Sequence, residues 1–107
     1  MEFLNRVELR GHVGNVRVTS VADKNVARIQ MATEQCYKNR NGEAVIETTW
    51  HNVSVWEGSG CPDVNAIAKG DRIYVQGRIR NARYVGSDGM ERTFSEVLAD
   101  KVSKMEA

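Results

Sequence analysis

The sequence predicts an all-β domain with the OB-fold, a five-stranded Greek-key barrel that carries a short helix between its third and fourth strands. Three observations lead to this prediction. Five stretches of the chain alternate apolar and polar residues with a period of two, as strands do. Glycines interrupt the first stretch, where a barrel strand has to bend. The one segment with helical spacing lies between the third and fourth stretches, whereas SH3-like and ubiquitin-like layouts place the helix elsewhere or omit it.

The expected strands cover about residues 6–21, 26–37, 45–56, 72–84 and 90–102. In the first strand the apolar residues change from odd-numbered to even-numbered positions after Gly14, which predicts a bulge or sharp bend. Turns are expected at 22–25, at the Asn-Gly pair within 38–43, and at the glycine-flanked tip 86–89. In the fourth strand we expect Ile73, Val75 and Ile79 to point inward.

The helical segment is expected to begin at Pro62, a residue that suits a first helical turn. Val64, Ile67 and Ala68 follow at helical spacing, and Gly70 ends the segment. The helix should therefore have at most about two turns.

Length and composition limit what the chain can be. Its 107 residues fit a single domain, 1–107, and 41% hydrophobic residues suffice for one modest core. The net charge of +1 excludes a histone-like protein but not nucleic-acid binding, which depends on where the charges lie. The chain has no apolar run of 18 residues, no signal-peptide organisation and only two isolated cysteines. We therefore expect a cytoplasmic protein with reduced cysteines.

The stretch 45–56 carries both tryptophans of the chain on one face of its expected strand. Side chains alternate across a strand, so Val53 and Val55 lie on the face opposite to Trp50 and Trp56. We expect the valines in the core and the tryptophans among polar neighbours on the outside. Two exposed tryptophans favour a binding function, although a second sheet or a helix covering that face would explain them equally well.

Aromatic and basic residues are interleaved in a way that suits single-stranded nucleic acid. Aromatic rings stack on bases of any sequence, at roughly 1–3 kcal/mol per base, and arginine neutralises phosphates. The segment 72–92 holds five arginines against two acidic residues, a local excess of positive charge. The side chains expected to contact DNA are Trp50, Trp56, Tyr37, Tyr84, Arg28, Lys38, Arg40, Arg72, Arg78, Arg80 and Arg83.

The chain resembles the DNA-binding domain of bacterial single-stranded DNA-binding proteins. The most specific matches are the Trp-His pair at 50–51 and the Gly-Arg-Ile-Arg segment at 77–80. The matching stretches occur in the family's order and cover the chain from about residue 5 to 102; they are 5–14, 31–33, 49–53, 69–80 and 96–102. The resemblance implies sequence-tolerant binding of single-stranded DNA in replication, recombination or repair, without a cofactor.

The resemblance also implies roles for particular residues. Trp50 matches a base-stacking tryptophan, and Trp56 stands where the family usually has a stacking phenylalanine. Tyr37 and Tyr84 stand at positions often held by stacking tryptophans, so each should stack less strongly. His51 matches a histidine at a subunit contact, and the first strand, with Val7 and Leu9, resembles the edge through which family members pair. The implied assembly is a homotetramer, a dimer of dimers.

The sequence ends at Ala107. Typical members of the family continue with a Gly- and Gln-rich linker and an acidic tip that recruits replication and repair proteins. We therefore expect a domain without that tail, and no recruitment of such proteins through it.

Two other functions fit the same fold. The first is a tail-less adaptor like the primosomal relatives of the family, which would not need four aromatic residues on its binding face. The second is RNA binding, which competition between DNA and RNA oligonucleotides would distinguish. An enzyme is not expected, because His12 and His51 have no metal-ligand spacing and no glycine loop could hold a phosphate. Cys36 and Cys61 are expected to be small buried residues rather than nucleophiles.

Overall fold

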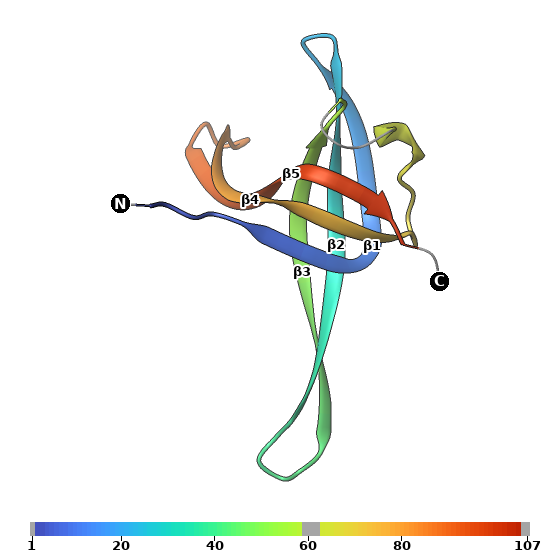
Figure 1. Ribbon diagram of the computed structural model, residues 1–107. Helices are drawn as coiled ribbons and strands as arrows, with labels where there is room; N and C mark the ends of the chain where they lie inside the picture. The colour runs from blue at the N-terminus through green and yellow to red at the C-terminus, as the bar shows by residue number, and fades with distance from the viewer. Residues whose placement is uncertain (1, 59–62, 106–107) are drawn as a thin grey trace.

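The computed structural model describes residues 2–58 and 63–105 and contains a closed barrel with the strand order β1-β2-β3-β5-β4 (Figure 1). All pairings are antiparallel except the short parallel contact between β3 and β5. The predicted five-stranded OB-fold is thereby confirmed. The elements are β1 (Val7–Val21), β2 (Lys24–Lys38), β3 (Ala44–Trp56), the 3₁₀ turn η1 (Val64–Ala66), β4 (Arg72–Val85) and β5 (Glu91–Lys104).

The core consists of aliphatic residues from alternate positions of the barrel strands. Ile29, Met31, Val53, Val55 and Ile73 are each at most 1% exposed. Because alternate residues of one strand share a face, the period of two in the sequence places all of them inside the barrel. Burial of each such side chain stabilises the fold by about 1.5–3 kcal/mol.

The bend predicted in the first strand is a bulge at Gly14. Val13 pairs with Met31 and Asn15 with Gln30, so Gly14 has no partner in β2. β1 pairs with β4 through residues 7–12 and with β2 through residues 12–21, which lets one strand contribute to both sides of the barrel. Gly11 lies at the crossing, where an added Cβ would be 2.0 Å from the carbonyl oxygen of Ala32.

The turns have simple local causes. Ala22 and Asp23 both have positive φ, 50° and 68°, as the two central residues of a tight β1–β2 hairpin require. In the β2–β3 hairpin the side chain of Asn39 accepts from the backbone amides of Asn41 and Glu43. Gly42, at φ 79°, completes that turn, as the Asn-Gly pair predicted.

The short helix predicted between the third and fourth strands is present, within the described residues, as a single 3₁₀ turn over Val64–Ala66, inside the limit of about two turns. Val64 and Ile67 are buried, as their spacing indicated. The side chain of Asp63 accepts from the amide of Asn65 and caps the turn. Pro62, the expected helix start, lies outside the described residues, as does Cys61.

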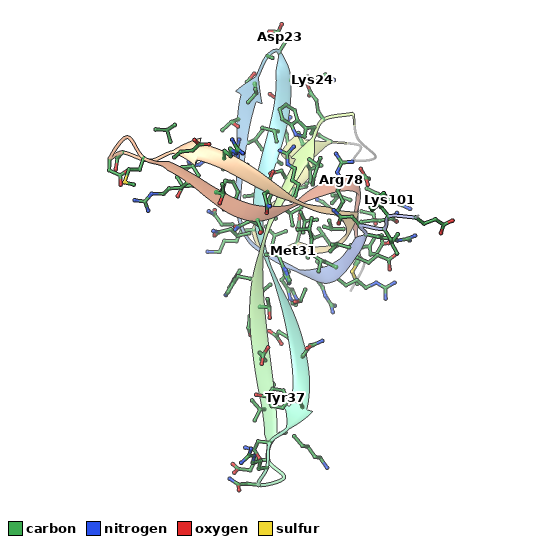
Figure 2. All side chains as sticks on the ribbon, turned by 90° about the vertical axis from the view of Figure 1, so that its left-hand side faces the viewer. Asp23, Lys24, Met31, Tyr37, Arg78 and Lys101 are labelled. Atoms are coloured by element: carbon green, nitrogen blue, oxygen red, sulfur yellow. The ribbon has the colours of Figure 1, made fainter. Side chains whose placement is uncertain are left out.

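The β2–β3 and β4–β5 hairpins extend beyond the barrel (Figure 1). Some of their residues are exposed although the sequence pattern placed them inside. Ile79 is 51% exposed and stays outside the core cluster of the described residues, because beyond Gly77 β4 no longer pairs with β1. Cys36, expected to be buried, is exposed because it belongs to the projecting part of the β2–β3 hairpin, whose far end is marked by Tyr37 in Figure 2.

Candidate nucleic-acid interface

A groove follows the outward face of β3. The side chains of that face are, in order, Trp50, Asn52, Ser54 and Trp56, and the two tryptophans lie about 20 Å apart along the strand at roughly 3.3 Å per residue. Three adjoining cavities of about 190, 300 and 250 Å³ follow this row, and all three are lined by Glu96. The groove therefore runs between the β1–β2–β3 sheet on one side and the β4–β5 hairpin on the other.

Trp50 lies at one end of the groove and is 61% exposed. Its ring lies against β1 at Gly14, where an added Cβ would be 2.4 Å from Cζ3 of the indole. The glycine that forms the bulge thus also makes room for the tryptophan. With one part of the ring held against the backbone and the rest open to solvent, Trp50 can present a flat surface to a ligand without losing a core contact.

The other end of the groove is formed by Trp56 and the β4–β5 hairpin. Trp56 is half-buried and lines the 250 Å³ cavity together with Arg28 and Tyr84. The ring of Tyr84, 48% exposed, meets that of Phe94 edge-on, with centroids 5.7 Å apart and an interplanar angle of 64°. Aromatic side chains therefore stand at both ends of the groove.

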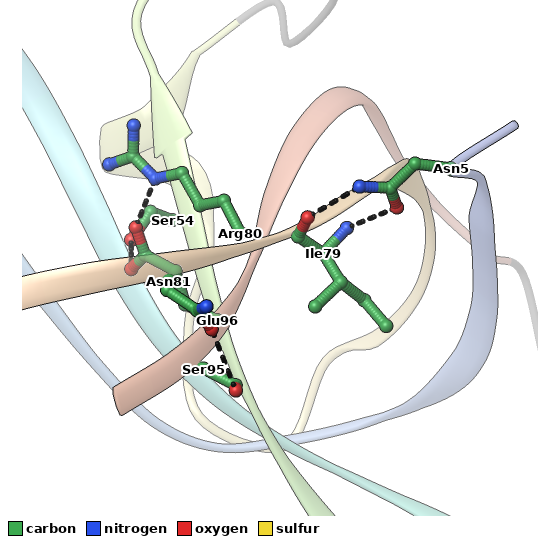
Figure 3. Close-up of polar contacts among 7 residues, drawn as sticks. All are labelled: Asn5, Ser54, Ile79, Arg80, Asn81, Ser95 and Glu96. Atoms are coloured by element: carbon green, nitrogen blue, oxygen red, sulfur yellow. Dashed lines mark hydrogen bonds and ion pairs between the residues drawn. The ribbon is translucent and has the colours of Figure 1, made fainter. Parts of the chain in front are cut away.

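A buried carboxylate connects the three strands that meet at the centre of the groove. Glu96 in β5 is only 5% exposed. One of its carboxylate oxygens accepts from the Ser54 hydroxyl at 2.8 Å and the other from Nε of Arg80 at 2.6 Å (Figure 3). Because both oxygens are satisfied, the charge of Glu96 is compensated inside the protein. Arg80 keeps its terminal nitrogens for other partners, since the ion pair uses Nε.

The excess of three positive charges counted in residues 72–92 is reduced to two by Glu96, which lies outside the segment and pairs with Arg80. Besides Arg80, two more arginines of the segment are paired: Arg83 with Glu91 at 3.3 Å and Arg92 with Asp88 at 2.8 Å. These two pairs are largely exposed and contribute little to stability. Hydrogen bonds from the Met90 amide and from Arg92 lower the pKa of the Asp88 carboxyl, so this hairpin tip stays ionised.

His51 lies beside the groove rather than in open solvent. Its Nε2 is 2.8 Å from the Thr33 hydroxyl, and the residue is among those that line the same cavity as Trp50 and Ile79. Burial lowers the pKa of the imidazole, so the neutral form is favoured. Val7 and Leu9 are half-buried and pack against the core, so any contact that this part of β1 makes with another chain would use its backbone edge and its outward side chains.

The structure brings only some of the predicted site residues together. Trp50, Trp56, Tyr84, Arg28, Arg80 and Arg83 line the groove. Tyr37, Lys38 and Arg40 lie at the end of the β2–β3 hairpin, away from the barrel (Figure 2). Arg72 lies at the other end of β4, opposite His12, and Arg78 is exposed on β4 outside the three cavities.

The site residues predicted from the sequence include no groove residue from β5 and none from the second half of β1. Phe94 and Glu96 line the groove from β5, and Arg17 lines it from β1. The alternation of side chains in β1 beyond the bulge could have indicated Arg17, because Arg17 directly follows Val16, which points inward. Phe94 could have been found only with the β4–β5 register, which sets it opposite Ala82.

Known proteins resemble this chain over almost its whole length. The model of a family described as the single-strand binding protein family matches residues 4–105. The chain belongs to this family. It is 31% identical to the single-stranded DNA-binding protein of Neisseria meningitidis over 105 residues, which are 95% of this chain and 60% of that protein. It is 33% identical to the mitochondrial single-stranded DNA-binding protein of Oryctolagus cuniculus over 109 residues, covering 92% of this chain and 73% of that one.

The fold agrees with solved structures of the family. A Plasmodium falciparum SSB in complex with single-stranded DNA superposes with a TM-score of 0.77 at 23% identity and covers 99% of this chain and 98% of that one. Within residues 2–58 and 63–105 there is no helical segment with the length and hydrophobicity of a membrane crossing. The same residues bring no group of three potential metal ligands together.

Proposed function

We propose that this chain binds single-stranded DNA with little regard to sequence. The observation that carries the proposal is the groove of β3, with Trp50 at one end and Trp56 and Tyr84 at the other. Rings at that spacing suit a strand whose bases are unstacked and free to lie on aromatic faces. Membership of the single-strand binding protein family, and the single-stranded DNA in complex with the Plasmodium protein, support the same ligand.

Binding would proceed by stacking and charge neutralisation, without catalysis. Bases stack on the exposed rings, and Arg28 together with the terminal nitrogens of Arg80 meets phosphates. The exposed Tyr37, with Lys38 and Arg40 beside it, would extend the path along the β2–β3 hairpin. The setting we propose is replication, recombination or repair in a bacterial cytoplasm. Duplex DNA, whose bases are already stacked and paired, offers no free base face to this groove.

A titration at two salt concentrations tests the proposal. Single-stranded DNA, duplex DNA and single-stranded RNA of equal length are added while tryptophan fluorescence is recorded. We expect strong quenching by single-stranded DNA, much weaker quenching by duplex, and affinity that falls as salt rises. Equal affinity for single-stranded DNA and duplex would contradict stacking on unpaired bases. Tighter binding of RNA would favour the RNA-binding alternative instead.

We also propose a homotetramer with two-fold symmetries. In the described part of the chain, residues 7–11 of β1 pair with β4 only, which leaves their other edge open to a second copy. One domain of this size also offers a short path for a long strand. Light scattering at micromolar concentration should give four times the chain mass, and a stable monomer mass would overturn the assembly.

A further inference from the structure

We propose that Phe94, Arg17 and Arg28 form a nucleotide subsite at the centre of the groove, in which the ring holds a base and the two arginines hold its phosphate. The inference rests on the proposed binding of single-stranded DNA and assigns roles to a part of the groove between the tryptophans. All three residues line the same cavity of about 300 Å³.

The arginines are arranged in a way that folding alone does not favour. Arg17 in β1 lies directly opposite Arg28 in β2, one step from the inward pair of Val16 and Ile29. Directly opposed residues of an antiparallel pair have Cβ atoms about 4.5–5.5 Å apart, and like charges there destabilise the sheet. Within the described residues neither arginine forms an ion pair. An anion placed between them would remove the repulsion.

The carboxylate that lines the same cavity as this pair does not compensate it. Glu96 lines the cavity, but its two oxygens are occupied by Ser54 and Arg80. The neighbouring cross-strand pair, Asn15 and Gln30, is neutral and polar. A phosphate diester is the anion that fits, because guanidinium groups bind phosphate oxygens through paired N–H donors and the groove already has stacking surfaces on both sides.

Phe94 faces the arginines from the opposite wall of the groove. It lines both the 300 Å³ and the 250 Å³ cavity and is half-buried. Its partner in β4 is Ala82, which has a small side chain, and Tyr84 meets the ring edge-on, so that part of Phe94 stays exposed to the groove. A base can therefore lie on the ring of Phe94 while its phosphate reaches the arginines across the groove.

Two variants test the subsite with an end-labelled oligothymidylate as the probe. Phe94→Leu keeps an apolar side chain but removes the aromatic face, and should weaken binding by about five- to 150-fold, the range for one stacked base. The double variant Arg17→Gln/Arg28→Gln should flatten the slope of log K against log salt by roughly 0.7, the value for one phosphate on a single strand. Phe3→Leu and Arg6→Gln serve as matched controls, because neither residue lines the described groove cavities.

The outcomes separate this inference from the proposed function. Suppose that the parent binds single-stranded DNA and that Trp50→Ala weakens this binding. If Phe94→Leu then binds within twofold of the parent, or if the arginine variant keeps the parent slope, the subsite is wrong while the proposed binding groove stands. If the parent itself does not prefer single-stranded DNA, the proposed function fails first. Both arginines are exposed, so the arginine variant gives a folded protein even where Phe94→Leu does not.

Discussion

The first half of β4 lies in the barrel and the second half in the projecting hairpin, and the two halves use apolar residues differently. Ile73 and Val75 are fully buried, whereas Ile79 and Val85 are 51% and 70% exposed. In the first half β4 is paired with β1 on one side and β5 on the other, and the barrel closes around its inner face. In the second half β5 is the only strand among the described residues that pairs with β4, and the side chain of Asn5 is hydrogen-bonded to the backbone of Ile79 on the other edge. Alternation along a strand therefore shows which residues share a face, while burial depends on what closes over that face.

The same contrast separates stability from binding. The barrel half holds the core, and the hairpin half presents Arg80, Tyr84 and, across the strand pair, Phe94 to the groove. Substitutions of core residues in the barrel half should therefore lower the free energy of unfolding. Substitutions of groove residues in the hairpin half should mainly weaken binding.

The largest difference should be between two isoleucines of this one strand. Ile73→Ala removes a side chain that is 0% exposed and should lower the free energy of unfolding by about 2–5 kcal/mol. Ile79→Ala, at a half-exposed position, should cost under about 1 kcal/mol. Urea unfolding of both variants measures the two values. Equal losses would mean that the hairpin half is covered in solution, for example by another subunit.

Two arginines of the hairpin should differ because their carboxylate partners differ. Arg80→Ala leaves Glu96 buried beside Ser54 without its cation, which should cost about 1–3 kcal/mol of unfolding free energy; the half-exposed position of Arg80 moderates the loss. Arg83→Ala breaks an exposed pair with Glu91 and should cost about 0–1 kcal/mol. Thermal unfolding compares the two. Arg80→Ala is consequently a poor probe of phosphate contact, and a stable Arg80→Ala variant would show that Glu96 is hydrated.

Gly14→Ala should weaken binding without removing any aromatic ring. The new methyl group would lie 2.4 Å from the present position of the Trp50 ring, so the indole has to move away from β1. We expect single-strand affinity to fall by about 1 kcal/mol, the lower end of the value for one stacked base. The tryptophan emission maximum should shift as well. Parent-like affinity and emission would show that the ring is not held against the glycine.

The smallest effect is a pH dependence through His51. Burial lowers the pKa of its imidazole in the folded state, so the unfolded chain binds the proton more readily. Stability from this residue is present above the ordinary histidine pKa of about 6.5 and is lost as the pH falls below it. Comparing unfolding at pH 7.5 and 5.5 for the parent and His51→Gln isolates this contribution. A variant with the same pH dependence as the parent would assign the loss to other groups.

Much of the fold could be predicted because it depends on local patterns. The alternation around Val53 and Val55 determined which face Trp50 and Trp56 occupy, and the slip after Gly14 predicted the bulge. The spacing of Val64 and Ile67 set an upper limit of about two helical turns, and one 3₁₀ turn is enough to bury both residues. Ile79 was misassigned because its pattern continues that of Ile73 and Val75 beyond the point where the barrel ends.

The centre of the groove could not be predicted, since it depends on long-range register. Ser54 and Glu96 are 42 residues apart, and they meet only where β3 and β5 make their short parallel contact. The pairing of Phe94 with Ala82 also depends on a register shift between β4 and β5, at Gln76 and Gly77. Neither the contact between Ser54 and Glu96 nor the pairing of Phe94 with Ala82 can be derived from the periodicity of a single strand.

Trp50→Ala, with unfolding and single-strand affinity measured on the same sample, tests the central claim most directly. A ring that serves the groove and not the core should cost about 1–3 kcal/mol of affinity when it is removed. The loss of stability should stay well below the 3–5 kcal/mol typical of deleting a buried large aromatic residue. A severely destabilised variant, or a stable one that binds like the parent, would contradict the assignment of Trp50 to the binding groove.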